Sequence, residues 1–551
     1  MSGVRSLEGL LAAPQDVNDD DIIHVLTECA RQSSNVSFRE QVETSTIDDS
    51  SFLPFLTSRW LALQHLDGSS PSTIDQGVAA IDDDDDDGLS YSYTTTTSDS
   101  AATDIPSRSA FLDDSDAAST HVNVLLAMYR VLRNICASSP INQTKLKAVL
   151  PFTTNVLTGM IGYLDCSHDE ELHAVIVTCM QVMLQFVANM TVHHTANQDI
   201  LWPAFHPHLL EKVLVECQKY RKVLAYAAAV VLNCLHPPHA IRTTDLVKSR
   251  QIVILLLQRC LSFQSQDESD PALEWITMIF QVLVKRHYTA DLYRNLSASL
   301  LSTLWSKLTP EQMLLLRMVD LVVAPDDSSS PVDGVESSRS NDDLIAFLCA
   351  EYTGLHVPNE APSNKNDVNA AVSADRQAMW NVMETESSKL MLRILGTLTS
   401  SACVEEHSEN VLTFIPVLIA QLQRLSPTHA RETNAAAALS GDDVVQDETF
   451  GYRSAGVRVL GNMAHRNPSV QDALRACGGL EVLLNSCNID PNNPMIREWA
   501  LVALRHVCEG NEQNQAYIRA LAPQQVVSRV DLSKMGVEPV LEHNKVTLKP
   551  L

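Results

Sequence analysis

The sequence predicts an all-α protein made of stacked helical repeats, an α-solenoid interrupted by disordered acidic insertions. Apolar residues recur every three or four positions over most of the 551-residue chain, the period of a helix with one buried face. Prolines and short polar turns separate these stretches. One short motif also repeats at a constant internal spacing, which is typical of repeat proteins.

Composition agrees with helix packing. Aromatic residues make up 5% of the chain, whereas sheets concentrate aromatic and β-branched side chains. The chain is longer than one hydrophobic core usually fills. Several domains or one extended array of repeats are therefore expected.

The helical period is clearest in residues 171–190, where Leu172, Ile176, Cys179 and Met183 fall on one face. Similar patterns predict helices in further stretches, namely 121–136, 209–235, 248–261, 272–286, 291–306, 311–323, 387–399, 409–425 and 454–464.

One motif occurs four times, starting at Leu132, Val187, Leu460 and Leu504. Each copy has an apolar residue near the end of a predicted helix and a glutamine eleven positions later. Asn stands at position +2 in three copies and at +10 in three. The starts lie 55 residues apart in the first pair and 44 in the second, the length of an armadillo unit of two or three helices. The predicted fold is therefore an armadillo/HEAT-like α-solenoid.

Each motif position has a physical interpretation. The apolar residue lies on the buried face of a long third helix. The Asn at +2 lies near the end of that helix, where its amide can donate to carbonyls or bridge to the next loop. The Asn at +10 suits the N-cap of the following helix, and the Gln packs inside its first turn. We favour helix-end caps and loop clamps over a row of ligand-binding amides along a groove.

Residues 456–521 contain one whole unit. Gly478 and Gly479 are expected to supply a turn that needs positive φ. Pro494 is expected at the start of a long third helix, residues 495–508. This helix is apolar nearly all round, so we expect neighbouring repeats to cover it on several sides.

Acidic segments carry most of the net charge of −27. Residues 67–118 hold thirteen acidic residues and one arginine, including a run of six aspartates. Such segments have too little apolar surface to offset the entropy of ordering. Disordered acidic linkers are predicted at 67–118 and 325–342, and flexible insertions at about 356–374 and 428–447. No Lys/Arg-rich stripe exists, so nucleic acid is not an expected partner.

The chain end breaks the helical pattern. Val537 to Leu541 and Lys545 to Leu548 are predicted to pair as a hairpin that covers the last repeat. The predicted organisation has seven parts: an N-terminal helical segment (1–66), an acidic linker (67–118), armadillo-like repeats (119–324), a second acidic linker (325–342), helices with a flexible insertion (343–447), a C-terminal repeat domain (448–525) and a cap or tail (526–551).

Residues 456–518 resemble the C-terminal domain of the ataxin-10 family. Four stretches carry the resemblance: Leu460-Gly461-Asn462, Gln471, the run CNIDPNNPMIREWA at 487–500, and Asn514-Gln515. The chain departs from the motif where His506 replaces the Asn at +2 and where Val470 replaces the Asn at +10. The rest of the chain resembles the family only as an armadillo-like, helix-rich region.

The resemblance implies a cytoplasmic armadillo protein without known catalysis. The family is linked to cell survival, cytokinesis and signalling through partner proteins, including heterotrimeric G-protein β subunits and a glycosyltransferase. We therefore expect a non-enzymatic scaffold with no cofactor and no metal, which binds proteins through a concave groove and the C-terminal domain. The expected interaction residues are Asn462, Arg497, Glu498 and Arg505. Self-association is left open, and the alternative is an exchange factor or chaperone of a GTPase.

Motifs of catalysis and membrane insertion are missing from the sequence. Gly456 to Gly461 has the glycine spacing of a P-loop, but Asn462 and Met463 stand where Lys and Ser/Thr are needed. Neither H-E-x-x-H nor G-x-S-x-G occurs, so an enzyme with a site assembled across the fold is only a remote alternative. The longest apolar run, 223–232, is shorter than the about 20 residues of a membrane span. The 12 cysteines form no C-x-x-C pair and are expected to be reduced and buried.

Overall fold

The computed structural model describes most of the chain and leaves gaps at the predicted insertions. The described residues are 2–12, 17–66, 115–164, 169–261, 270–297, 307–324, 336–356, 374–401, 408–425, 449–521, 536–542 and 545–550. They form two compact units, Met1–Ile279 and Phe280–Leu551.

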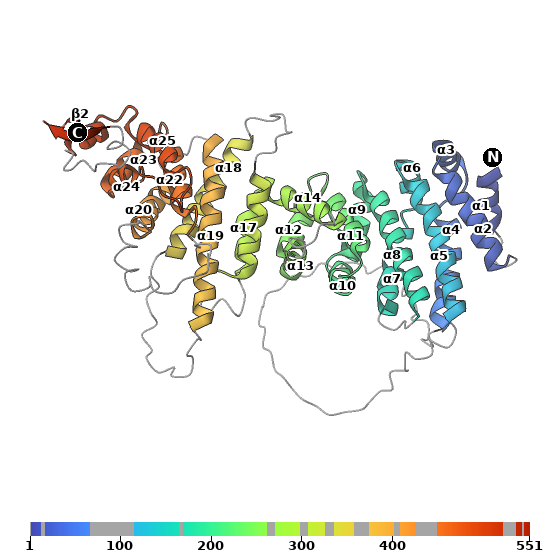
Figure 1. The fold of residues 1–551 in the computed structure, drawn as a ribbon. Coiled ribbons are helices and arrows are strands. Elements are labelled where there is room, and N and C mark those ends of the chain that lie inside the picture. Colours follow the sequence, from blue (N-terminus) through green and yellow to red (C-terminus); the bar gives the residue numbers. More distant parts are fainter. Residues whose placement is uncertain are drawn as a thin grey trace, which may run out of the picture. The chain divides into compact units, whose positions relative to one another are not determined.

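Both units are built from helices packed side by side (Figure 1). The first unit contains α1 (Ser2–Ala12), α2 (Asp19–Ser33), α3 (Val36–Thr44), α4 (Asp49–Leu66), α5 (Ser115–Cys136), α6 (Pro140–Lys145), α7 (Val149–Leu164), α8 (Glu170–Thr191), α9 (Thr195–Phe205), α10 (His208–Glu216), α11 (Arg221–Leu235), α12 (Ala240–Lys248), α13 (Arg250–Leu261) and most of α14 (Pro271–Lys285).

The second unit begins within α14. It contains α15 (Thr289–Leu296), α17 (Pro310–Val323), α18 (Glu336–His356), α19 (Ala374–Ser401), α20 (Glu409–Arg424), α22 (Tyr452–Ala464), α23 (Pro468–Ala476), α24 (Gly479–Asn485), α25 (Ile496–Cys508), α26 (Glu512–Ala520), β1 (Val537–Glu542) and β2 (Lys545–Pro550).

The long helices of successive repeats lie against one another, as the repeat motif predicts. In the first unit α2 packs on α5, α5 on α8, and α8 on α11. In the second unit α19 packs on α22, and α22 on α25. Short helices connect the long ones and cover their other sides. The predicted all-α, armadillo-like solenoid fold is confirmed within each unit.

Helix α8 is the most apolar long helix among the described residues. Its length and composition would suffice to cross a membrane, but 61% of its most apolar 18-residue window is buried inside the protein. Helices α5 and α11 both pack against it. A helix in a protein core can be as long and as apolar as a membrane-spanning helix. The contacts of α8 are those of a core helix.

Several predicted boundaries are wrong. The stretch 209–235 holds two helices, α10 and α11, because a turn over residues 217–220 divides it. Helix α18 begins at Glu336, within the predicted linker 325–342, and α5 begins at Ser115, within the predicted linker 67–118. Acidic residues near both starts favour a helix N-terminus. The other residues of these linkers, and almost all of the insertions at 356–374 and 428–447, lie outside the described residues.

The predicted hairpin is confirmed. Strands β1 and β2 are antiparallel, with Val537 opposite Pro550 and Glu542 opposite Lys545. That the hairpin covers the last repeat stays a prediction.

Candidate functional site

In each of the four motif copies, one side chain caps the helix that follows the long helix. The residue at position +7 of each copy accepts a hydrogen bond from the backbone N–H three residues later, at 3.0–3.3 Å. These caps are Ser139, His194, Asn467 and Asn511. The expectation that the Asn at +10 is the N-cap is therefore wrong, because the cap lies three residues earlier and +10 is already inside the helix.

The Asn at +10 turns back to the preceding long helix. Asn142, Asn197 and Asn514 are buried, and each side-chain N–H donates to a carbonyl at the end of that helix at 2.9 Å. These carbonyls have no partner within their helix. The Asn side chains therefore supply the bonds that the helix end itself lacks.

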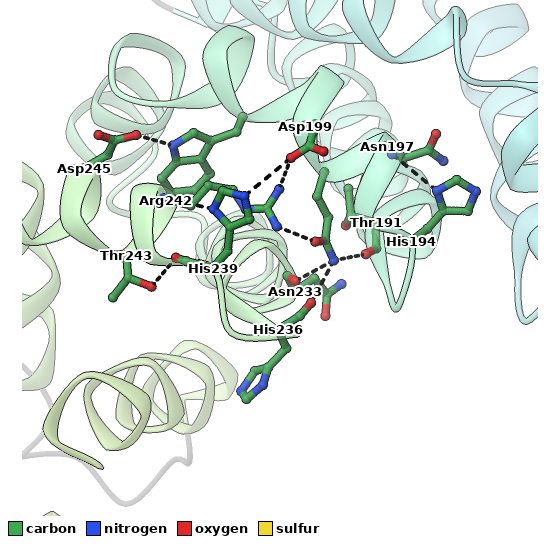
Figure 2. A network of polar contacts seen from close by, with 12 residues as sticks. Thr191, His194, Asn197, Asp199, Asn233, His236, His239, Arg242, Thr243 and Asp245 are labelled. Carbon is green, nitrogen blue, oxygen red and sulfur yellow. Dashed lines mark hydrogen bonds and ion pairs between the residues drawn. The ribbon is translucent and has the colours of Figure 1, made fainter. Parts of the chain in front are cut away.

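The Gln at +11 joins two repeats. The Nε2 of Gln198 donates to the carbonyls of Thr191, Asn233 and His236 at 2.8–2.9 Å, and the last two belong to the next repeat (Figure 2). In the second unit Gln471 donates to carbonyls of its own repeat and of the next at 2.9–3.3 Å. One side-chain amide thus satisfies the ends of two neighbouring long helices.

The residue at +2 hydrogen-bonds to the preceding long helix, whereas the Gln at +11 reaches the following one. Asn189 donates to the carbonyl of Arg133 at 2.8 Å, and Asn233 donates to that of Ala188 at 2.9 Å. His506 makes the same contact as an Asn, because its Nδ1 lies 2.9 Å from the carbonyl oxygen of Gly461. Together the amides at +2, +10 and +11 form what we call the amide ladder.

The amide ladder confirms the interpretation of these residues as caps and clamps. Asn462, which we expected to contact a partner protein, belongs to it. Its Nδ2 lies 3.1 Å from the carbonyl of Gly396 and 3.2 Å from the hydroxyl of Thr399, both on α19. A partner-binding role for Asn462 stays a prediction.

Asn233 shows that the ladder has a copy that the sequence motif missed. The turn after α11 is one residue longer, and Arg242 and Thr243 stand where Asn and Gln would be expected. Arg242 is 2% exposed; its guanidinium donates to Asp199 Oδ1 at 2.6 Å and to Gln198 Oε1 at 2.9 Å (Figure 2). Arg242 thus adds an ion pair and a hydrogen bond to the contacts that Gln198 and Asn233 make between these two repeats.

The loop of the fourteen-residue run 487–500 caps α22 from a distance. Helix α22 has glycine at its N-cap, without a side chain to accept its first N–H groups. The Oδ1 of Asn493 accepts the N–H groups of Arg453 and Ser454 at 2.9 and 3.3 Å. Asp490 pairs with the guanidinium of Arg453 at 2.7 Å and accepts from Asn493 Nδ2 at 2.8 Å. This part of the run is a packing device.

The helical part of the run carries an exposed stripe. We call Arg497, Glu498, Leu501, Val502 and Arg505 the α25 face; all five are exposed, with Leu501 at 53% and Val502 at 40%. Their spacing of three and four residues places them on one side of α25. The expectation that this helix is covered on several sides is wrong, because among the described residues no further long helix follows it.

One neighbouring detail also differs from expectation. Pro494 precedes the helix rather than opening it, and Met495 in the left-handed conformation is the N-cap. Trp499 is half-buried, and the guanidinium of Arg458 lies 5.1 Å from its ring centre. Gly478 has the predicted positive φ of 76°.

Nine of the ten described cysteine thiols have a raised pKa, with burial as the largest cause. All ten described cysteines are free, and six of them are buried. Burial raises the pKa of Cys179 and Cys234 to about 12. A reactive thiol needs a lowered pKa. No group of three His, Cys, Asp or Glu residues in the described part of the chain is arranged to hold a metal ion.

A polar cavity of about 380 Å³ lies among helices of the second unit. Its lining consists of Leu355, His356, Asn381, Glu384, Thr385, Ser388, Gln421, Arg424, Leu425, Thr449 and Tyr452. The hydroxyl of Ser388 donates to the carbonyl of Glu384, and Nδ1 of His356 donates to that of Tyr352. These bonds hold both groups to their own helices, whereas a catalytic triad needs them bonded to each other.

Comparison with known proteins finds a family model that matches the C-terminal part and relatives that align over most of the chain. Residues 452–549 match the family model described as the spinocerebellar ataxia type 10 protein domain. The chain is 23% identical over 443 residues to ataxin-10 of Bos taurus, an alignment that covers 78% of this chain and 82% of the bovine protein.

A second relative matches the chain over a shorter stretch. The ataxin-10 homolog of Dictyostelium discoideum is 36% identical over 100 residues, which is 18% of this chain and 16% of that protein. The crystal structure of SYS-1 aligns over 97% of this chain and 98% of its own, at 10% identity and a TM-score of 0.29. This score is too low to show a common fold.

Proposed function

Since this chain belongs to the ataxin-10 family, we propose that it is a non-enzymatic scaffold that acts by binding other proteins. Its place would be the cytoplasm. Its processes would be those that the family resemblance implies, namely cytokinesis, cell survival and signalling through partner proteins.

The chemistry of the described residues supports a scaffold over an enzyme. The polar groups that the motif brings together, such as Gln198 and Asn197, are bonded to backbone carbonyls. A catalytic site would instead aim a nucleophile, a base and a donor at one point in a pocket. The side-chain bonds that recur in each repeat therefore hold neighbouring helices together.

The α25 face is the observation that carries the proposal. Two large apolar side chains, Leu501 and Val502, stand exposed next to each other, and charged residues surround them. An apolar centre with a polar rim is the usual composition of a protein interface. A scaffold should lose partners when this centre is made charged.

Proximity labelling with the full chain tests the proposal. The double variant Leu501→Glu/Val502→Glu is compared with the natural chain and with Leu321→Glu, a matched control at a leucine that is 66% exposed on α17. We expect partner proteins to be labelled by the natural chain and the control and to be lost, by about tenfold or more, with the double variant. Candidates are then tested for direct binding to the purified full chain.

Two results would contradict the proposal. One is labelling by the natural chain that does not differ from that of the free labelling enzyme. The other is accelerated nucleotide release from a purified GTPase in a panel assay, which would favour the alternative of a GTPase regulator.

A further inference from the structure

Building on the proposed scaffold function, we propose that the α25 face binds an α-helix of a partner protein, which packs as the next long helix of the stack. Helix α22 and helix α25 are equivalent elements, 44 residues apart in the sequence. Helix α22 is covered by α25, so their interface shows what an equivalent helix on α25 would contact. Three features at this interval support the comparison.

The first is an arginine at the start of the helix. Arg453 pairs with Asp490, which stands in the loop before α25. Its equivalent, Arg497, is exposed, and no carboxylate of the described residues forms an ion pair with it. The helix that covers α25 should therefore bring an acidic residue just before its own start.

The second is the glutamine of the amide ladder. Gln471 donates to the carbonyls of His506 and Glu509, at the end of the helix that covers α22. Its equivalent, Gln515, donates only to Cys508, in its own repeat, as far as the described residues show. Its amide is placed to bond to the C-terminal carbonyls of a further helix.

The third is the apolar seam. Val457 is fully buried, and Gly461 lies so close to α25 that a Cβ on it would be 2.9 Å from the Cβ of Ala503. The equivalents on α25 are Leu501, which is 53% exposed, and Arg505. Arg505 therefore stands on α25 at the position that Gly461, which has no side chain, holds on α22. The covering helix should carry small apolar residues opposite Leu501.

These features define the partner. It is a helix about as long as α25, parallel to it, with an acidic residue before its first turn, a seam of small apolar residues and exposed C-terminal carbonyls. A second copy of this chain does not offer such a helix through its own α25, because Ala500, Ala503 and Val507 already face α22 and are buried.

A synthetic peptide can stand in for this helix. Residues 488–511 of this chain, with Cys508→Ser and an N-terminal fluorophore, contain Asp490 and the α25 seam. We expect the purified full chain to bind the peptide with a dissociation constant in about the micromolar range, measured by fluorescence anisotropy. Leu501→Glu, Arg497→Glu and Gln515→Ala in the chain should weaken binding, the first two by about tenfold or more. The control Leu321→Glu should not.

A charge exchange separates recognition from general loss of structure. The chain with Arg497→Glu should regain affinity for a peptide with Asp490→Lys, because the pair is restored with opposite sign. Absence of binding by the natural chain, binding that Leu501→Glu leaves unchanged, or no recovery in the exchange would each overturn the inference. Sedimentation of the chain alone that shows a dimer lost in Leu501→Glu would also overturn it, since a second copy would then be the occupant. If partners in proximity labelling survive Leu501→Glu/Val502→Glu, the scaffold function stands and this site fails.

Discussion

Asn493 is a single residue on which the start of α22 depends. Its Oδ1 accepts two backbone N–H groups that the glycine N-cap cannot satisfy, and the side chain is buried. Replacing Asn493 by Ala should destabilise the start of α22 by about 1–2 kcal/mol, because side-chain caps contribute this much. Amide hydrogen exchange of Arg453 and Ser454 should then become about 5- to 30-fold faster.

A neighbouring asparagine provides the control. Asn488 lies in the same loop but is exposed and donates only to the nearby carbonyl of Asn485. Asn488→Ala should change exchange in α22 by a small amount, within about 0.5 kcal/mol. Equal effects of the two substitutions would show that Asn493 does not act as the cap.

At the scale of an element, the amide ladder holds each long helix to the next. Gln198 donates to three carbonyls, two of them in the following repeat, whereas Gln515 donates to one. Each such bond contributes about 1 kcal/mol, and a buried carbonyl left alone costs more. Gln198→Ala should therefore lower the free energy of unfolding of its unit by about 2 kcal/mol or more, and Gln515→Ala by less than about 1 kcal/mol. Chemical denaturation of the full chain measures both, and a larger effect at Gln515 would contradict the ladder.

The sequence predicted the periodic parts of these elements because their cause is local. Helical spacing, the positive φ of Gly478 and the shared environment of Leu132, Val187, Leu460 and Leu504 follow from short-range rules. Position +10 was misassigned because Asn favours both an N-cap and a bond to a nearby carbonyl, and spacing alone does not separate them.

The features that the sequence did not predict depend on tertiary contacts. The contacts of Asn493 cross about 40 residues of sequence, and Arg242 replaces an amide after a turn one residue longer, so neither shows in a fixed motif. Exposure of Leu501 depends on whether another long helix follows, which the apolar pattern of α25 does not encode. The structure places Arg497, Glu498 and Arg505 on one exposed face of α25, and their role in partner binding stays a prediction.

At the scale of the whole molecule, charge and structure are separated along the chain. Three acidic segments, 67–118, 326–343 and 442–448, carry −21 of the net charge of −27, and most of their residues lie outside the described part. The helical units are therefore only mildly acidic. Their cohesion rests on apolar seams and amide contacts between neighbouring repeats rather than on long-range charge.

This short-range cohesion predicts how a local defect spreads. In repeat proteins, stability is close to a sum of repeat terms and nearest-neighbour terms. Gln471→Ala removes bonds that join α23 to the ends of α22 and α25, so exchange should accelerate in these helices and less in α20. Hydrogen exchange followed by mass spectrometry on the full chain measures every described helix at once.

The same substitution should leave the first unit unchanged. The residues of its ladder, such as Gln143 and Gln198, bond only within Met1–Ile279. Gln198→Ala should produce the reverse pattern, with faster exchange in α9, α11 and α12 and unaltered exchange in α22 and α25. Acceleration of equal size in both units from either substitution would mean that the chain unfolds as one cooperative block, and nearest-neighbour contacts through the amide ladder would then not be what sets its stability.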